Sequence, residues 1–118
     1  MKCSGHLLTF SGTNFTSIYK IVKDDKFTVS RSFVTAEIND KLIFLQSFWN
    51  GYEYEIKLSE TKANNYSGEI FRNKEKSGKI YLTKLTNNSE DVVLIGDYIE
   101  DEISYDCFIK LKAVKEQI

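Results

Sequence analysis

The chain has 118 residues, sixteen basic and seventeen acidic, with a net charge of −1. That length predicts one domain over residues 1–118, which buries roughly two-thirds of the surface that its unfolded chain exposes. The balanced charge excludes a global field that would attract duplex nucleic acid. No stretch approaches the roughly 18 apolar residues that span a bilayer, so we expect a cytoplasmic protein or the soluble part of a membrane-anchored one, with any membrane contact made by a segment outside this sequence.

The first third of the chain predicts two or three short strands. Residues 7–10 form a short apolar run, and residues 17–23 fit a strand or a short helix, of which we favour the strand. Residues 27–34 alternate with period two. One face carries Phe27, Val29, Arg31 and Phe33. Because three of these four residues are apolar, we expect this face to be the inward one.

The central stretch, residues 41–58, predicts a β-hairpin. Asn50-Gly51 separates two runs rich in apolar residues, and Asn-Gly favours a type I′ turn because both central residues of that turn have positive φ. A two-residue loop determines the register. The expected inner pairs are Trp49 with Tyr52, Ser47 with Tyr54, Leu45 with Ile56, and Ile43 with Leu58. The first strand is also apolar on its other face.

Four more strands are predicted after this hairpin, over residues 66–72, 78–86, 91–99 and 103–113. Gly68 and Gly96 lie inside two of them, which indicates bulges or tight bends. Seven or eight strands at regular spacings, with loops too short for crossover helices, predict an all-β antiparallel meander. We favour a closed β-barrel over the alternative, a β-sandwich, because the strands keep one apolar parity that is interrupted by interior glycines.

The inventory of catalytic and metal-binding residues is small. His6 is the only histidine, Cys3 and Cys107 are the only cysteines, and no nucleophile, phosphate-loop, zinc or calcium motif is present. Glu53 and Glu55 lie two apart on one strand face, which is more typical of a solvated outer face than of an acid pair. We therefore expect no catalytic residues, no metal and no cofactor. Two thiols without a disulfide framework favour a reducing compartment.

Arginine is the more informative residue type. Arg31 and Arg72 are the only arginines, and parity directs both inward; a guanidinium suits a phosphate or a carboxylate in a partly dry site. Aromatic residues on apolar parities would add stacking faces: Trp49, Tyr52, Tyr54, Tyr66 and Tyr105. Together these residues predict a pocket for a small anionic, nucleotide-like ligand. The alternative is that each arginine ends its strand at the rim and pairs with a carboxylate, while the aromatic rings fill the core.

Phe44, Phe48 and Phe108 fall on outward parities and predict an exposed apolar patch. Such patches mark partner surfaces, and a homo-oligomer is the commonest arrangement. A protein-interaction or oligomerisation module without a small-molecule ligand is therefore the alternative function. An isomerase or hydrolase would require a titratable pair inside the barrel that the sequence does not show.

One hairpin of the meander contains Tyr66-Ser67-Gly68-Glu69, and Leu94-Ile95-Gly96-Asp97-Tyr98 precedes the last strand. With these features the meander resembles the calycin-type small barrels such as lipocalins and avidins. The lipocalin Gly-x-Trp motif is absent, and Trp49 is the only tryptophan. In size the chain is also similar to the β-barrel sensor domains of bacterial membrane-anchored antiphage effectors of the CBASS type. That resemblance implies recognition of a cyclic di- or oligonucleotide and oligomerisation in the membrane.

Overall fold

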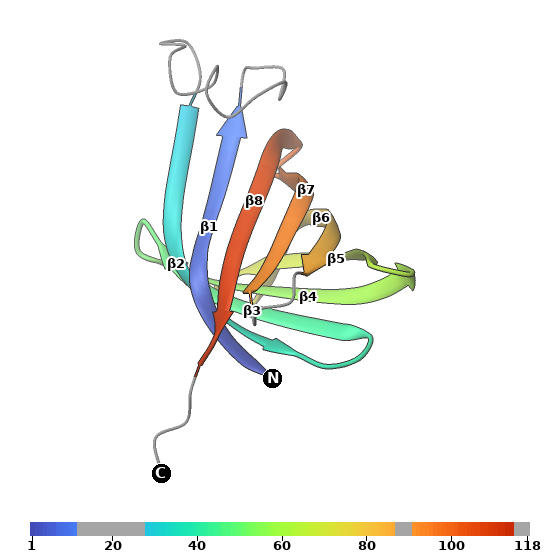
Figure 1. The fold of residues 1–118 in the computed structure, drawn as a ribbon. Helices are drawn as coiled ribbons and strands as arrows, with labels where there is room; N and C mark the ends of the chain where they lie inside the picture. The colour runs from blue at the N-terminus through green and yellow to red at the C-terminus, as the bar shows by residue number, and fades with distance from the viewer. Residues whose placement is uncertain (12–27, 87–90, 115–118) are drawn as a thin grey trace.

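The computed structural model describes residues 1–11, 28–86 and 91–114. They form one closed barrel of eight antiparallel strands, each hydrogen-bonded to the next along the chain and the last to the first. The strands are β1 (Lys2–Ser11), β2 (Thr28–Ile38), β3 (Leu42–Trp49), β4 (Tyr52–Lys62), β5 (Asn65–Arg72), β6 (Glu75–Thr86), β7 (Asp91–Glu100) and β8 (Ile103–Ala113). In Figure 1, β1, β2, β7 and β8 cross β3, β4 and β5 at a steep angle, as tilted strands on opposite walls of a small barrel do.

The predicted barrel is therefore confirmed, and the sandwich alternative is wrong. The central hairpin has the predicted register, from Trp49 opposite Tyr52 to Ile43 opposite Leu58, and its turn has φ of 52° at Asn50 and 82° at Gly51. The last strand has the predicted bounds. β1 is longer than the predicted 7–10, because its backbone pairs with both β2 and β8 from its first residues. The strand predicted at 17–23 lies outside the described residues.

Three two-residue turns lie at one end of the barrel, which we call the mouth. They join β3 to β4, β5 to β6, and β7 to β8, and both residues of each turn have positive φ. Positive φ is sterically costly for side chains other than glycine, yet two of these turns, Asn73-Lys74 and Asp101-Glu102, contain no glycine. The right-handed twist of the paired strands selects this turn geometry.

The barrel interior changes character along its axis. Away from the mouth it is filled by branched aliphatic side chains that are at most 3% exposed: Ile43, Leu45, Ile56, Leu58, Ile70, Ile80, Leu82, Leu94, Ile109 and Leu111. Toward the mouth the inward positions carry serine, threonine, tyrosine and tryptophan instead. The aliphatic end therefore stabilises the fold, and the mouth is free to hold a site.

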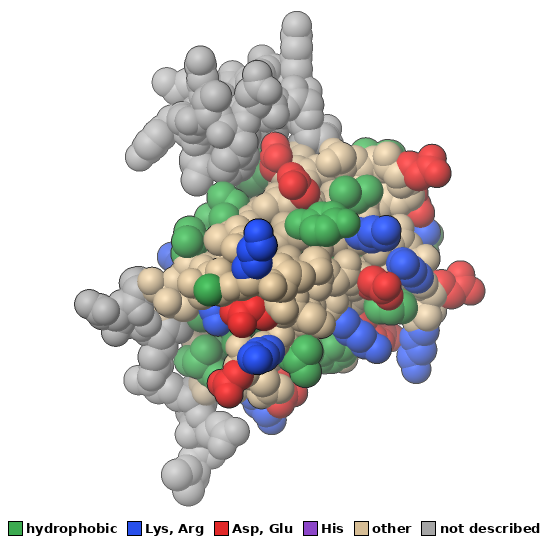
Figure 2. Space-filling view, turned by 90° about the vertical axis from the view of Figure 1, so that its right-hand side faces the viewer, with side chains coloured by type: hydrophobic (Ala, Val, Ile, Leu, Met, Phe, Trp, Pro, Cys, Tyr) green, Lys and Arg blue, Asp and Glu red, His purple; other side chains and the backbone are tan. Residues whose placement is uncertain are grey.

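The outer surface is mixed in charge. Figure 2 shows basic and acidic side chains interspersed over the face that it presents. The described residues include no helix long and apolar enough to cross a bilayer.

Candidate ligand pocket at the barrel mouth

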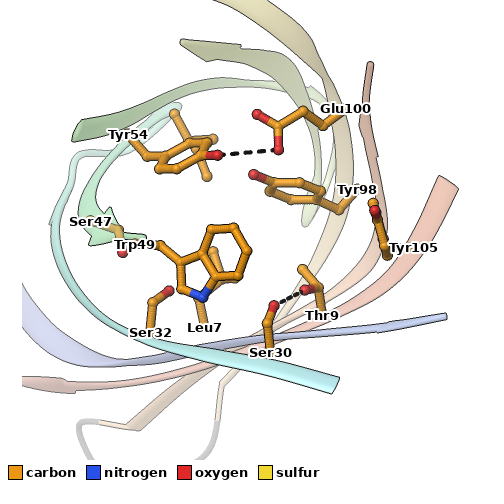
Figure 3. A pocket seen from close by; sticks show the side chains of 11 residues that line it. Leu7, Thr9, Ser30, Ser32, Ser47, Trp49, Tyr54, Tyr98, Glu100 and Tyr105 are labelled. Atoms are coloured by element: carbon orange, nitrogen blue, oxygen red, sulfur yellow. Dashed lines mark hydrogen bonds between the residues drawn. The ribbon is translucent and has the colours of Figure 1, made fainter. Parts of the chain in front are cut away.

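A pocket of about 170 Å³ opens at the mouth of the barrel. Its lining comes from β1, β2, β3, β4, β7 and β8 (Figure 3): Leu7, Thr9, Ser30, Ser32, Ser47, Trp49, Tyr54, Ile56, Tyr98, Glu100 and Tyr105. Sites for drug-sized ligands span about 300–1,000 Å³, whereas an engineered protein cavity of about 150 Å³ binds benzene. The pocket therefore suits a single ring.

The pocket lining includes hydroxyl groups that already have partners. The Thr9 and Ser30 hydroxyls hydrogen-bond to each other at 2.5 Å, and Ser47 Oγ donates to the Phe33 carbonyl oxygen at 2.8 Å. These bonds explain how Thr9 and Ser47 tolerate burial, since a buried hydroxyl without a partner is costly. The serines are small, and their size leaves the space that the pocket occupies.

Glu100 ends β7 at one wall of the pocket, with a side chain that is 14% exposed. Its Oε2 accepts a hydrogen bond from Ser77 Oγ at 2.8 Å and lies 3.6 Å from the guanidinium of Arg72. Ser77 reaches Glu100 because the β5–β6 register shifts between Ile70 and Phe71, which leaves Ser77 as the extra residue of a bulge. The bulge on β6 thus orients a carboxylate on the neighbouring strand β7, 23 residues further along the chain.

Two tyrosines face this carboxylate. Tyr54 Oη donates to Glu100 Oε1 at 3.4 Å, and in Figure 3 the Tyr98 hydroxyl also points toward Glu100. Burial, with a smaller contribution from Glu100, raises the pKa of both phenols. Both side chains are therefore neutral at physiological pH and present hydroxyl groups to the pocket. Tyr105 packs edge to face on Tyr98, with ring centroids 6.2 Å apart.

Arg72 lies at the rim rather than in the pocket lining. Its guanidinium donates to Asp101 Oδ2 at 2.9 Å and sits 5.5 Å from the centroid of the Tyr52 ring. The alternative of a strand-end arginine paired with carboxylates is therefore the one that the structure shows for Arg72.

The inward orientation predicted for Arg31 is wrong. Arg31 is exposed, and so is Phe33, at 58%, whereas the inward parity of β2 carries Ser30, Ser32 and Val34. Continuing the β2–β3 register beyond Val34 opposite Ser47 places Phe33 across from the outward Phe48. A period of two groups residues by face but does not show which face is inside. The outer face of β2 carries apolar residues, and for that reason the sequence wrongly predicts it to be the inward face.

Of the predicted aromatic residues, Trp49, Tyr54 and Tyr105 line the pocket. Tyr52 is 42% exposed at the rim under Arg72. Tyr66 lies near the β4–β5 turn at the opposite end, where its ring carries Lys84 Nζ 5.3 Å above it. Its buried hydroxyl has no hydrogen-bond partner among the described residues.

Glu100 and Tyr98 were missed as site residues, although the parity of β7 pairs them on the inward face with Leu94. That signal was available in the sequence. The serine lining was not recognisable, because polar residues on one strand face normally indicate solvent.

The three phenylalanines predicted as an interface do not form one patch. Phe48 on β3 is 73% exposed, whereas Phe44 on the same strand and Phe108 on β8 are only partly exposed. β3 and β8 are separated by β1 and β2 in the barrel order. Phe33 on β2 is the other strongly exposed phenylalanine of the described residues, and it packs edge to face against His6.

Both cysteines are free and buried. Cys3 pairs across to Ala113 and Cys107 to Thr9, so they lie six residues apart along the β1–β8 ladder. At about 3.3 Å per residue, that distance excludes a disulfide. Among the described residues, no group of three or more potential metal ligands occurs.

No protein-family model matches the chain, and no curated protein is detectably similar to it.

Proposed function

We propose that this protein is a binding module that takes a small, single-ring organic ligand into the mouth of its barrel. The observation that carries the proposal is the change along the axis: buried aliphatic side chains fill one end, whereas small serines at the mouth leave a pocket of about 170 Å³ walled by aromatic rings. Concave sites with aromatic walls and a few convergent polar groups are typical of ligand pockets. The resemblance to calycin-type barrels implies the same use of the interior.

The geometry favours a neutral or cationic ligand over the anionic, nucleotide-like one that the sequence predicts. Arg31 faces outward, and Arg72 is shared by Asp101 and Glu100. A nucleotide would have to place its base in the pocket and its phosphates at the rim beside these carboxylates. Cyclic di- and oligonucleotides, the ligands implied by the resemblance to antiphage sensor domains, are therefore tested in the binding assay as a separate class of compound.

Trp49 gives the assay its readout, because it is the only tryptophan and lines the pocket. We expect ring-sized compounds to change its fluorescence and to show saturation transfer by ligand-observed NMR, and Ser32→Phe to abolish both effects by filling the pocket. Thr35→Phe is the matched control, since Thr35 is exposed three residues further along β2. If no compound in a diverse ring-sized set changes the Trp49 fluorescence or shows saturation transfer, or if binding to Ser32→Phe is unchanged, the proposal is overturned.

The alternative from the sequence, an interaction or oligomerisation module, stays a prediction. The most exposed phenylalanines that could form its interface are Phe48, at 73%, and Phe33, at 58%. Sedimentation velocity over a range of concentrations tests it. Self-association that Phe48→Ser weakens would support that class, and a monomer at all concentrations would argue against a homo-oligomer.

A further inference from the structure

Glu100 is the only charged side chain among the described residues that line the pocket. A carboxylate has roughly four acceptor positions. Oε2 uses two directions, toward Ser77 at 2.8 Å and Arg72 at 3.6 Å. Oε1 receives one long hydrogen bond, from Tyr54 at 3.4 Å. Glu100 therefore keeps acceptor capacity on the oxygen next to the pocket (Figure 3).

The charges around Glu100 do not balance. Among the described residues, Arg72 is the cation paired with it, and that guanidinium lies closer to Asp101, at 2.9 Å, than to Glu100, at 3.6 Å. One positive group thus serves two carboxylates, and the cluster carries a net charge of −1. A carboxylate that is largely removed from water is stabilised by a counter-charge. A positively charged group in the pocket would supply it, and an anion would be repelled.

The pocket walls suit a cation as well. Trp49, Tyr54, Tyr98 and Tyr105 present rings around Glu100, and a cation near the face of an aromatic ring is attracted by its quadrupole. The same chemistry already operates at the rim, where Arg72 lies 5.5 Å from the Tyr52 centroid. The raised pKa of Tyr98 keeps its phenol neutral beside the carboxylate.

We infer that the ligand is a small organic ammonium compound: its amine binds the Glu100 carboxylate, and its ring lies against Trp49 and the tyrosines. This inference rests on the proposed function, whose ligand class it specifies. Ser77 and Arg72 act as positioning residues, because they hold Oε2 and so direct Oε1 toward the pocket. The ligand's N–H groups donate to Oε1, which replaces the weak contact from Tyr54 as the principal hydrogen bond of that oxygen.

Three compounds with one ring and different charges test the inference on the wild-type protein. Benzylamine is protonated at neutral pH, benzyl alcohol is its neutral counterpart, and benzoate is an anion of similar size. We expect calorimetry and Trp49 fluorescence to rank benzylamine first and benzoate last. Charge-assisted hydrogen bonds contribute enough that the preference of benzylamine over the alcohol should be about tenfold or more.

Glu100→Gln separates charge from shape, because glutamine keeps the size and one acceptor. We expect this variant to lose the preference for benzylamine while binding benzyl alcohol within about twofold of wild type. Glu102→Gln is the matched control: Glu102 lies two residues further on, exposed in the β7–β8 turn, and its loss should leave the ranking unchanged.

Benzyl alcohol or benzoate binding as tightly as benzylamine would overturn the inference and leave the proposed function standing. A preference for benzylamine that persists in Glu100→Gln would also overturn it. Absence of binding by all three compounds and by the wider ring-sized set would instead overturn the proposed function. The comparison on wild type does not depend on any variant being folded.

Discussion

Arg72 at the end of β5 and Asp101 in the β7–β8 turn form a 2.9 Å ion pair at the mouth of the barrel. They are 29 residues apart in the chain, and the pair connects two neighbouring hairpins. Asp101 also raises the pKa of Arg72, so the guanidinium is charged at every accessible pH. The pair assigns Arg72 a structural task at the rim and explains why an arginine on an inward parity does not make an anion site.

Replacing Arg72 should weaken the fold in a salt-dependent way. We expect Arg72→Ala to lower the melting temperature at low ionic strength, because it leaves Asp101 and Glu100 without their shared cation. The difference from wild type should shrink at about 1 M salt, where the Debye length is about 3 Å. Arg31→Ala, at the exposed arginine, is the control and should match wild type. A melting temperature of Arg72→Ala equal to that of wild type at low salt would contradict this role.

Asp106 on β8 lies directly opposite Asp97 on β7. Burial, and to a smaller degree the Asp97 charge, raises the pKa of Asp106 above its usual range. Because the folded state then binds the proton more tightly than the unfolded state, ionisation of Asp106 costs stability, and this cost is present at neutral pH and disappears in acid. Asp106→Asn should therefore raise the free energy of unfolding at pH 7, by about 0.2–1 kcal/mol for a like-charge cross-strand pair.

Urea unfolding at several pH values measures this effect. The gain from Asp106→Asn should vanish as the pH falls below the ordinary aspartate pKa of about 3.9. Asp97→Asn should also stabilise, and the double variant should gain less than the sum, since either change alone removes the repulsion. A gain that is constant from neutral pH to acid would show that charge is not the cause.

Gly96 is required by the close approach of two strands. A Cβ at this position would lie 1.9 Å from the carbonyl oxygen of Tyr81 on β6. Overpacking typically costs about 1–3 kcal/mol, and here the clash is with backbone that cannot rotate away, so Gly96→Ala should lose at least about 2 kcal/mol of unfolding free energy. Gly51→Ala is the contrast: it has open space but a φ of 82°, and should lose about 1 kcal/mol. Equal losses would mean that the strand spacing is not the constraint.

Cys107 should not react with thiol reagents in the folded protein. Burial, and secondarily Asp97, raises its pKa to about 12, and its side chain is 1% exposed. Reaction with a thiol reagent at pH 8 needs the thiolate and access, and both are lacking. Mass spectrometry should detect labelling of Cys107 only after denaturant is added. Ser104→Cys, at an exposed position on the same strand, should label at once, and labelling of native Cys107 at that rate would contradict the buried thiol.

The local sequence by itself determines much of the barrel, including strand register, strand bounds and several inward faces. Asn50-Gly51 determined the register of β3 and β4, because few sequences other than Asn-Gly accept two consecutive positive φ values so readily. Alternation predicted β8 residue for residue, from Ile103 to Ala113. It also placed Trp49, Tyr54 and Tyr105 on inward faces, and these three do line the pocket.

Only the closed barrel decided which face of β2 is inside. Periodicity pairs Ser30 with Ser32 and Arg31 with Phe33, but the direction depends on what the neighbouring strands offer. Thr9 on β1 is a polar partner for Ser30, and Ser47 on β3 donates to the backbone carbonyl of Phe33. The sequence likewise does not show that Glu100 meets Ser77 and Arg72, since this contact depends on a bulge in β6 and on how two neighbouring hairpins pack in the barrel. Alternation is a property of one strand, whereas a pocket is made by six, and the balance of polar and apolar groups across all six determines its place and its charge.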